Sequence, residues 1–197
     1  KERATDAVKS ADLIYCRDFN SLDRIDKLGE IISELDTPKA MIDHHIDPEP
    51  FAEIMFSDTS ASSTCEMIYR LIEMLGKKEK IDKDIASCIY TGIITDTGSF
   101  HHQLSPRLFK ICADLLEYGI EYQEIVDRVM NTVSEKRLRI LGDVLLSKME
   151  ILPRLKSAIV HLTKEDYKKY DISRGDTEGI VNYPLMIPGI ELSAFIH

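Results

Sequence analysis

The sequence Ala40-Met41-Ile42-Asp43-His44-His45 places one carboxylate and two imidazoles directly after a short apolar run. Three apolar residues with nothing polar between them predict a strand that is buried on both faces, as in parallel sheets. Ligand sites in open α/β sheets lie just beyond the carboxyl ends of the strands. Oxygen and nitrogen donors at such a point suit Mn²⁺, Fe²⁺ or Zn²⁺. We therefore expect a metal site here, and two histidines in an ordinary polar loop are the alternative.

The two histidines are expected to have different roles. Adjacent residues of an extended chain point in opposite directions, so His44 and His45 should not both bind one ion. One imidazole would bind the metal while its neighbour faces the substrate.

An earlier segment repeats this layout. Residues 13–16 form a short apolar run, and Asp18 follows it. Between the two runs, the apolar residues of segment 22–35 are spaced for one face of a helix, and Thr37-Pro38 ends the pattern. Strand, helix and strand predict two parallel neighbouring strands. Asp18 and Asp43 should therefore emerge at the same edge of the sheet.

A third carboxylate stands at the end of a predicted helix. Asp82 is its expected N-cap, apolar residues repeat at helical spacing over residues 85–94, and the pattern ends at Asp96. The negative charge of an Asp at a helix C-terminus interacts unfavourably with the helix dipole. A bound cation would offset this cost, which makes Asp96 a candidate ligand. His101 and His102 follow and are interpreted as solvated, with substrate contact as the alternative.

Two further segments offer polar groups to an anion. Ser63-Thr64-Cys65-Glu66 has the capping-box pattern, and the helix behind it would present free backbone N–H groups and hydroxyls. An ordinary cap is the interpretation that the local sequence favours. Arg137 belongs to a basic helix face that opens at Ser134, interpreted either as a solvated face or as part of a linker that faces a cleft.

Composition limits the classes of partner. The 197 residues are 44% hydrophobic and 30% charged, as in an ordinary globular protein, and the net charge of −9 argues against binding of long nucleic acid. No apolar run approaches the roughly twenty residues of a membrane span. The four scattered cysteines have no CxxC spacing and are typical of a reducing compartment, so we expect a cytoplasmic protein.

The pattern of elements changes near residue 153. We predict an α/β protein with a parallel-sheet N-terminal domain over residues 1–130 and a helical linker over residues 131–153. The start of a smaller α+β C-terminal domain is expected over residues 154–197.

Asp18, the Asp43-His44-His45 triplet and Asp96, taken in order, resemble the motifs of the DHH phosphoesterase superfamily. Segment 13–18 is similar to the family's second motif, segment 41–45 to its third, and segments 90–92 and 96–100 to its fourth. Segments 62–66, 175–179 and 181–182 resemble the branch of nanoRNase and pAp-phosphatase proteins, often labelled exopolyphosphatase-related. The likeness runs from about Ala11 to the end of the chain.

The resemblance implies a role for each matching residue. Asp18 would bridge two Mn²⁺ ions, and His44 and Asp96 would complete the shell of the second ion. Asp43 would support that shell by hydrogen bonding, as outer-sphere carboxylates do, and His45 would contact the scissile phosphate. The predicted sites are therefore catalytic Asp43 and His45, metal-binding Asp18, His44 and Asp96, and substrate-binding Ser63, Thr64 and Arg137.

Two family motifs are absent from these residues. The first motif, which supplies a His and two Asp ligands, should precede Asp18, and a Gly-rich motif with a His should follow His197. We therefore expect the chain to be part of a longer protein.

The implied function is Mn²⁺-dependent hydrolysis of short oligoribonucleotides or pAp by a metal-activated water. The alternatives are a cyclic di-AMP or pApA phosphodiesterase, a polyphosphate or pyrophosphate hydrolase, and a catalytically silent nucleotide-binding domain. The expected partners are short RNA or small nucleotides, with neither long nucleic acid nor a membrane, and a homodimer is left open.

Overall fold

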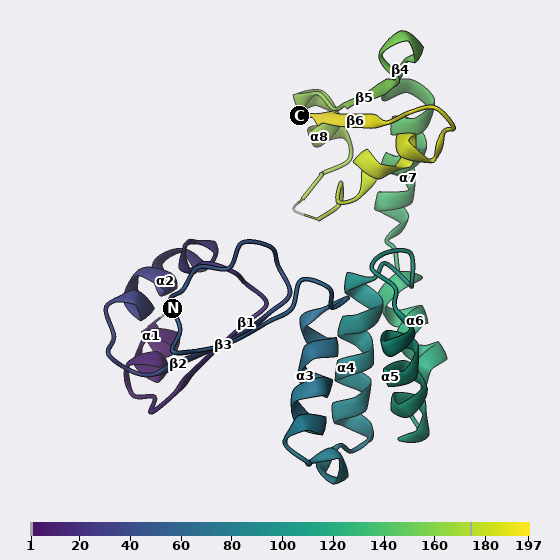
Figure 1. The fold of residues 1–197 in the computed structure, drawn as a ribbon. Coiled ribbons are helices and arrows are strands. Elements are labelled where there is room, and N and C mark those ends of the chain that lie inside the picture. The colour runs from purple at the N-terminus through teal and green to yellow at the C-terminus, as the bar shows by residue number, and fades with distance from the viewer. Residues whose placement is uncertain (1, 174) are drawn as a thin grey trace. The chain divides into compact units, whose positions relative to one another are not determined.

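The computed structural model describes residues 2–173 and 175–197, and the chain divides into two compact units, Lys1–Asn131 and Thr132–His197 (Figure 1). The first unit combines a parallel sheet with helices, so the α/β prediction is confirmed. Each unit has its own buried cluster of apolar side chains and is described by itself.

The sheet of the first unit has three strands, β1 (Ile14–Arg17), β2 (Lys39–Asp43) and β3 (Ile54–Ser57), in the order β1-β2-β3. Both pairs are parallel, which confirms the strand–helix–strand prediction. The central strand β2 is buried at all five positions. Its apolar run therefore forms the middle of the sheet because no face of it meets water.

The crossover between β1 and β2 is a 3-10 turn (Leu22–Ile25) followed by α2 (Asp26–Ser33), whereas the sequence predicts one helix. Asp26 has a φ of 50°, which breaks the helical path at that residue. The turn then packs onto α2 so closely that a Cβ on Gly29 would lie 1.9 Å from the Leu22 carbonyl oxygen. The short helix α1 (Glu2–Lys9) precedes β1.

Four helices complete this unit: α3 (Thr64–Met74), α4 (Lys83–Asp96), α5 (Pro106–Glu117) and α6 (Tyr122–Met130), with a 3-10 turn at Lys78–Lys80. α3 and α4 begin as the sequence predicts, since Ser63 and Asp82 each accept a hydrogen bond from a backbone N–H of the first turn, and Ser105 caps α5 in the same way. Their apolar faces share one cluster, in which Ile93, Leu108 and Leu115 are fully buried. A smaller cluster joins α3 to β2 through Met67 and Ile42.

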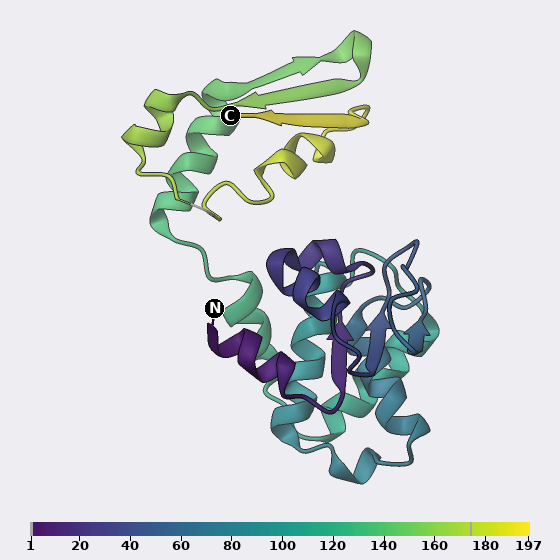
Figure 2. The same cartoon turned by 90° about the vertical axis from the view of Figure 1, so that its left-hand side faces the viewer.

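The second unit contains the sheet β4 (Met149–Leu152), β5 (Ser157–His161) and β6 (Leu192–Ile196), with β4 antiparallel and β6 parallel to β5 (Figure 2). Its helical elements are α7 (Glu135–Asp143), a π-helical turn (Val144–Lys148), 3-10 turns at Pro153–Leu155 and Ile180–Met186, and α8 (Lys164–Lys169). Mixed strands and helices agree with the predicted α+β character.

The segment predicted as a linker helix, residues 131–153, differs from the prediction. Its helical part ends at Lys148, and Met149–Leu152 is a strand of the sheet. Ile140 and Val144 are buried together with Val160, so this segment belongs to the core of the second unit. The apolar spacing did not distinguish the last turn of a helix from the start of a strand.

Within the described residues, no helix is both long and apolar enough to cross a bilayer. All four cysteines are free thiols, and Cys16 and Cys112 are buried as small apolar side chains. Cys88 is exposed instead.

Candidate metal centre

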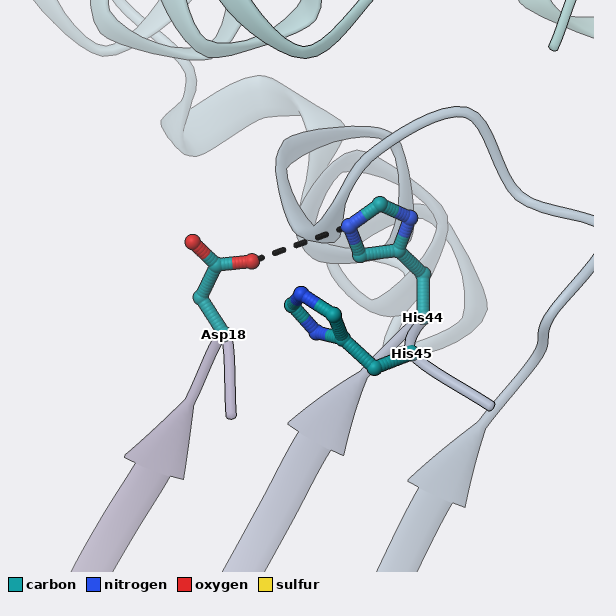
Figure 3. Close-up of side chains that lie close together, drawn as sticks. All are labelled: Asp18, His44 and His45. Carbon is teal, nitrogen blue, oxygen red and sulfur yellow. Dashed lines mark ion pairs between the residues drawn. The ribbon is translucent and has the colours of Figure 1, made fainter. Parts of the chain in front are cut away.

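The site lies where β1 and β2 end. Asp18 follows β1, and its N–H donates a hydrogen bond to the Ile42 carbonyl oxygen of β2 at 3.2 Å, so both strands deliver polar residues to one edge (Figure 3). Asp18 then adopts a φ of 66°, in the left-handed region that Asp tolerates better than most residues. This turn directs the chain away from the sheet as soon as the carboxylate has been placed.

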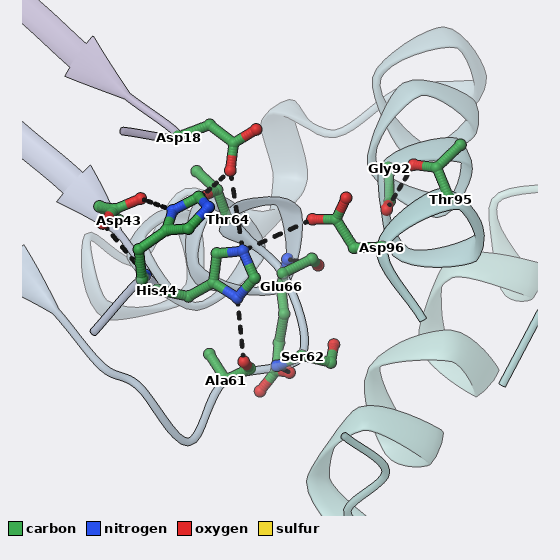
Figure 4. Close-up of polar contacts among 12 residues, drawn as sticks. Asp18, Asp43, His44, Ala61, Ser62, Thr64, Glu66, Gly92, Thr95 and Asp96 are labelled. Atoms are coloured by element: carbon green, nitrogen blue, oxygen red, sulfur yellow. Dashed lines mark hydrogen bonds and ion pairs between the residues drawn. The ribbon is translucent and has the colours of Figure 1, made fainter. Parts of the chain in front are cut away.

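His44 lies between two carboxylates that come from distant parts of the chain. Its Nε2 is 3.7 Å from Asp18 Oδ1 and 3.8 Å from Asp96 Oδ2, and its Nδ1 is 3.3 Å from the Ala61 carbonyl oxygen (Figure 4). A proton on Nδ1 donated to that carbonyl leaves a lone pair on Nε2, aimed at the two carboxylates. Both carboxylate distances exceed that of a normal hydrogen bond, so the three groups face one another without bonding directly.

These donors suit a divalent cation. The side chain of His44 is 13% exposed, that of Asp96 is 34% exposed and that of Asp18 is 56% exposed, so the group is reachable from solvent. Burial raises the pKa of Asp96, and the charge of Asp18 raises it further, while the two imidazoles oppose the shift. Carboxylate oxygens beside an imidazole nitrogen form a donor set that Mn²⁺, Fe²⁺ or Zn²⁺ accepts.

Asp96 is the last residue of α4, as the sequence predicts. Thr97 is fully buried, and its hydroxyl donates to the Ile93 carbonyl and accepts from the Phe100 N–H. Gly98 then takes a φ of 55° and allows the chain to turn. The helix end is therefore fixed by its own hydrogen bonds, which holds Asp96 in place.

His45 forms a separate pair with Asp43. Its Nδ1 lies 2.7 Å from Asp43 Oδ1, and its N–H donates to Oδ2 at 3.0 Å, while Asp43 is fully buried. The expectation that the two histidines point in opposite directions is wrong. Because β2 ends at Asp43, strand alternation does not extend to them, and their ring centroids are only 4.8 Å apart. Donor atoms of Asp18, His44 and His45 lie within 4.8 Å of one another.

Of the residues predicted to bind substrate, Ser63 and Thr64 have other partners in the structure. Ser63 is fully buried, and its hydroxyl accepts from the Glu66 N–H, which is the helix cap that the local sequence favours. Thr64 donates its hydroxyl to Asp18 Oδ1 at 2.9 Å. The capping box is modified, because the Glu66 carboxylate accepts from the Ser62 N–H rather than from Ser63.

Arg137 lies in the second unit, where its guanidinium donates to the carbonyl oxygens of Gly175 and Glu178. This side chain therefore stabilises the loop that contains Gly175 and Glu178, in its own unit. His101 and His102 are exposed, in agreement with the solvated interpretation.

The sequence could not have identified two partners of the site. Ala61 contributes only a backbone carbonyl, which no residue type reveals. The contact between Thr64 and Asp18 joins residues 46 positions apart. The sequence shows a polar run before α3, but the residues that this run contacts depend on the tertiary fold.

Residues 1–93 match the family model described as "DHH family, N-terminal domain". The chain is 34% identical over 105 residues to the "Bifunctional oligoribonuclease and PAP phosphatase NrnA" of Thermus thermophilus, covering 53% of this chain and 32% of that protein. The protein of the same name from Bacillus subtilis is 29% identical over 160 residues, covering 78% of this chain and 49% of that protein. The chain thus spans half or less of the length of these relatives.

A crystal structure of an exopolyphosphatase-related protein from Bacteroides fragilis has the same fold. It matches with a TM-score of 0.95 and 42% identity, covering 98% of this chain and 57% of that one. With the family match over the sheet and the first part of α4, these similarities support the resemblance that the motifs indicated. Residues 1–93 therefore form a domain of the DHH family, and the chain as a whole is similar to the nanoRNase and pAp-phosphatase proteins and to the exopolyphosphatase-related protein.

Proposed function

We propose that the protein containing this chain is a Mn²⁺-dependent phosphoesterase that hydrolyses short oligoribonucleotides or pAp. The observation that carries the proposal is the convergence of Asp18, His44 and Asp96, which come from the ends of β1, β2 and α4. No local feature of the chain brings these three side chains together. The names of the similar proteins support the same reaction class.

In this proposal Asp18, His44 and Asp96 hold the cation, which would stabilise charge on the phosphoryl oxygens and lower the pKa of a bound water. His44 is oriented by the Ala61 carbonyl, so Nε2 is the nitrogen that binds. Two carboxylates and one imidazole do not by themselves select Mn²⁺ from other divalent ions, so the choice of Mn²⁺ rests on the family resemblance.

His45 is proposed to contact the scissile phosphate. His45 Nδ1–H donates a hydrogen bond to Asp43 Oδ1, which fixes the ring, and Nε2–H of the protonated imidazolium would donate to a phosphate oxygen. Asp43 is buried and acts by orienting His45. It is thus a positioning residue in this proposal.

The net charge of −9 supports a short substrate. A long polyanion would need many basic contacts, whereas a cation and a few side chains suffice for a small one. The expected partners are therefore short RNA or small nucleotides, and the expected location is the cytoplasm. Substrate contacts of Ser63 and Arg137 are not part of the proposal because both side chains have intramolecular partners.

The test measures hydrolysis by the intact protein with Mn²⁺ for a panel of substrates: pAp, short RNA, pApA, cyclic di-AMP and pyrophosphate. We expect pAp or short RNA to rank first. Asp18→Asn and His44→Ala should each abolish the activity and Mn²⁺ binding because each removes a donor atom.

His161→Ala is the matched control for the loss of a histidine, since this exposed residue ends β5 in the second unit. It should retain wild-type activity. Full activity in both site variants would contradict the proposed centre. A first rank for cyclic di-AMP or pyrophosphate would replace the proposed substrate while leaving the centre intact.

A further inference from the structure

The segment from Ala61 to Thr64, which leads into the first turn of α3, contacts both proposed metal ligands at the edge of the sheet. The Thr64 hydroxyl donates to Asp18 Oδ1 at 2.9 Å, and the Ala61 carbonyl lies 3.3 Å from His44 Nδ1. Asp18 follows β1 and His44 follows β2. One short segment therefore contacts residues that follow two different strands (Figure 4).

This segment is held rigidly by its own hydrogen bonds. The Ser62 N–H donates to Glu66 Oε2 at 2.8 Å, and the Ser63 hydroxyl accepts from the Glu66 N–H at 3.0 Å. Ser62 and Ser63 are fully buried, and Glu66 and Thr64 are nearly so. The backbone that carries Thr64 is therefore held by hydrogen bonds, and the buried Ala61 and Met67 on either side of it pack with Ile42 of β2, which places the hydroxyl relative to the sheet.

The orientation of the Asp18 carboxylate depends on a hydrogen bond from another residue. Its side chain is 56% exposed, and among the residues that the structure describes the Thr64 hydroxyl is the one hydrogen-bond donor to its carboxylate. The oxygen that accepts this bond, Oδ1, is also the oxygen that faces His44 Nε2. A carboxylate oxygen has two lone pairs, so a bond from Thr64 occupies one direction and leaves the other for a cation.

We infer that Thr64 is a positioning residue of the metal centre, which orients the Asp18 carboxylate toward the cation, and not a contact to the substrate. This inference rests on the proposed function, because it presumes that Asp18 binds a metal. Without the hydroxyl, the exposed carboxylate would rotate among several orientations and bind the ion less tightly.

The test compares Mn²⁺ affinity, measured by electron paramagnetic resonance of the free ion, in the intact wild type and three variants. Thr64→Val preserves the side-chain shape and removes the hydroxyl, and we expect its affinity to fall by about 10–100-fold. Thr64→Ser restores the hydroxyl and should restore the affinity. The KM for substrate at saturating Mn²⁺ should stay near the wild-type value in Thr64→Val.

Thr95→Val is the matched control. Thr95 adjoins Asp96, but its hydroxyl donates to the Gly92 carbonyl of its own helix at 2.9 Å, so its removal should leave Mn²⁺ affinity unchanged. Circular dichroism checks that every variant is folded.

The possible results separate the inference from the proposed function. Wild-type affinity in Thr64→Val, or an equal loss in Thr64→Ser, would overturn the positioning role while leaving the centre intact. A raised KM with unchanged Mn²⁺ affinity would make Thr64 a substrate contact instead. Absence of Mn²⁺ binding in the wild type would overturn both the inference and the proposed function.

Discussion

Asp18 and Asp43 leave the same edge of one sheet but meet different surroundings. Both oxygens of Asp43 accept hydrogen bonds from His45, and the side chain is fully buried. Asp18 is more than half exposed and accepts one bond from Thr64. A buried carboxylate with satisfied oxygens suits a supporting role, whereas an exposed one has lone pairs left for a cation.

Asp166 provides a pH-dependent contribution to the second unit. The Thr163 N–H, Lys148 and the Thr163 hydroxyl hydrogen-bond its carboxylate and lower its pKa to about 2. Because the pKa is depressed in the folded state, this contribution is fully present above the unfolded value near 4 and is lost as the pH falls toward 2.

We expect Asp166→Asn to lower the free energy of unfolding of the second unit by about 1–3 kcal/mol at neutral pH. The difference from wild type should shrink as the pH falls through the interval from about 4 to about 2. Urea denaturation of the intact protein across this range measures it. Glu165→Gln, which removes an exposed carboxylate from the same turn, is the control. A difference that stays constant with pH would contradict the prediction.

The packing of α3 against α4 depends on one missing side chain. A Cβ on Gly92 would lie 2.1 Å from Cys65 Sγ and 2.8 Å from Cys65 Cβ. Cys65 is adjacent to Thr64, and Gly92 is one turn before Asp96. The close approach of these helices therefore affects both the stability of the first unit and the position of Asp96.

Gly92→Ala should destabilise the first unit by about 1–3 kcal/mol, because the added methyl group forces the two helices apart. It should also weaken Mn²⁺ binding, since the shift reaches Asp96. Chemical denaturation and Mn²⁺ titration of the intact protein measure the two effects.

Gly142→Ala is the matched control, because Gly142 is an exposed helical position where an added Cβ meets nothing within 4 Å. It should be neutral or stabilise by about 0.5–1 kcal/mol, as expected for Ala in place of Gly within a helix. Equal effects of the two substitutions would contradict the prediction, because the loss of stability could then not come from a clash with Cys65.

At the scale of the whole molecule, the proposed cation binds within one of the two units. Asp18, His44 and Asp96 all belong to Lys1–Asn131. A ligand that binds only the folded form stabilises it by about 2.7 kcal/mol at a concentration 100 times its Kd. Bound Mn²⁺ should therefore stabilise the unit Lys1–Asn131, which supplies the metal ligands, against unfolding.

We expect Mn²⁺ to slow amide hydrogen exchange at the ends of β1 and β2, in α3 and at the end of α4, with residues 132–197 unchanged. Peptide-resolved exchange with and without Mn²⁺ measures this. The Asp18→Asn variant should show no added protection, because it lacks a donor. Protection confined to the second unit would contradict the proposed location of the ion.

The sequence by itself determined the first two strands of the parallel sheet, the starts of α3 and α4, and the order of the candidate residues. The apolar run before Asp43 predicted a buried central strand, and β2 is buried throughout. Ser63 and Asp82 marked helix starts because a hydroxyl or carboxylate at an N-cap acts on its own first turn. Such interactions span three or four residues, so the local sequence contains all the information they need.

Only the tertiary structure decided how these residues meet. The direction of His45, the bond from Thr64 to Asp18 and the incorporation of residues 132–153 into the second unit all lay outside the local pattern. Each depends on where a strand stops or on a partner many residues away. Packing of distant segments fixes these contacts, and neither periodicity nor residue type records which segments will pack together.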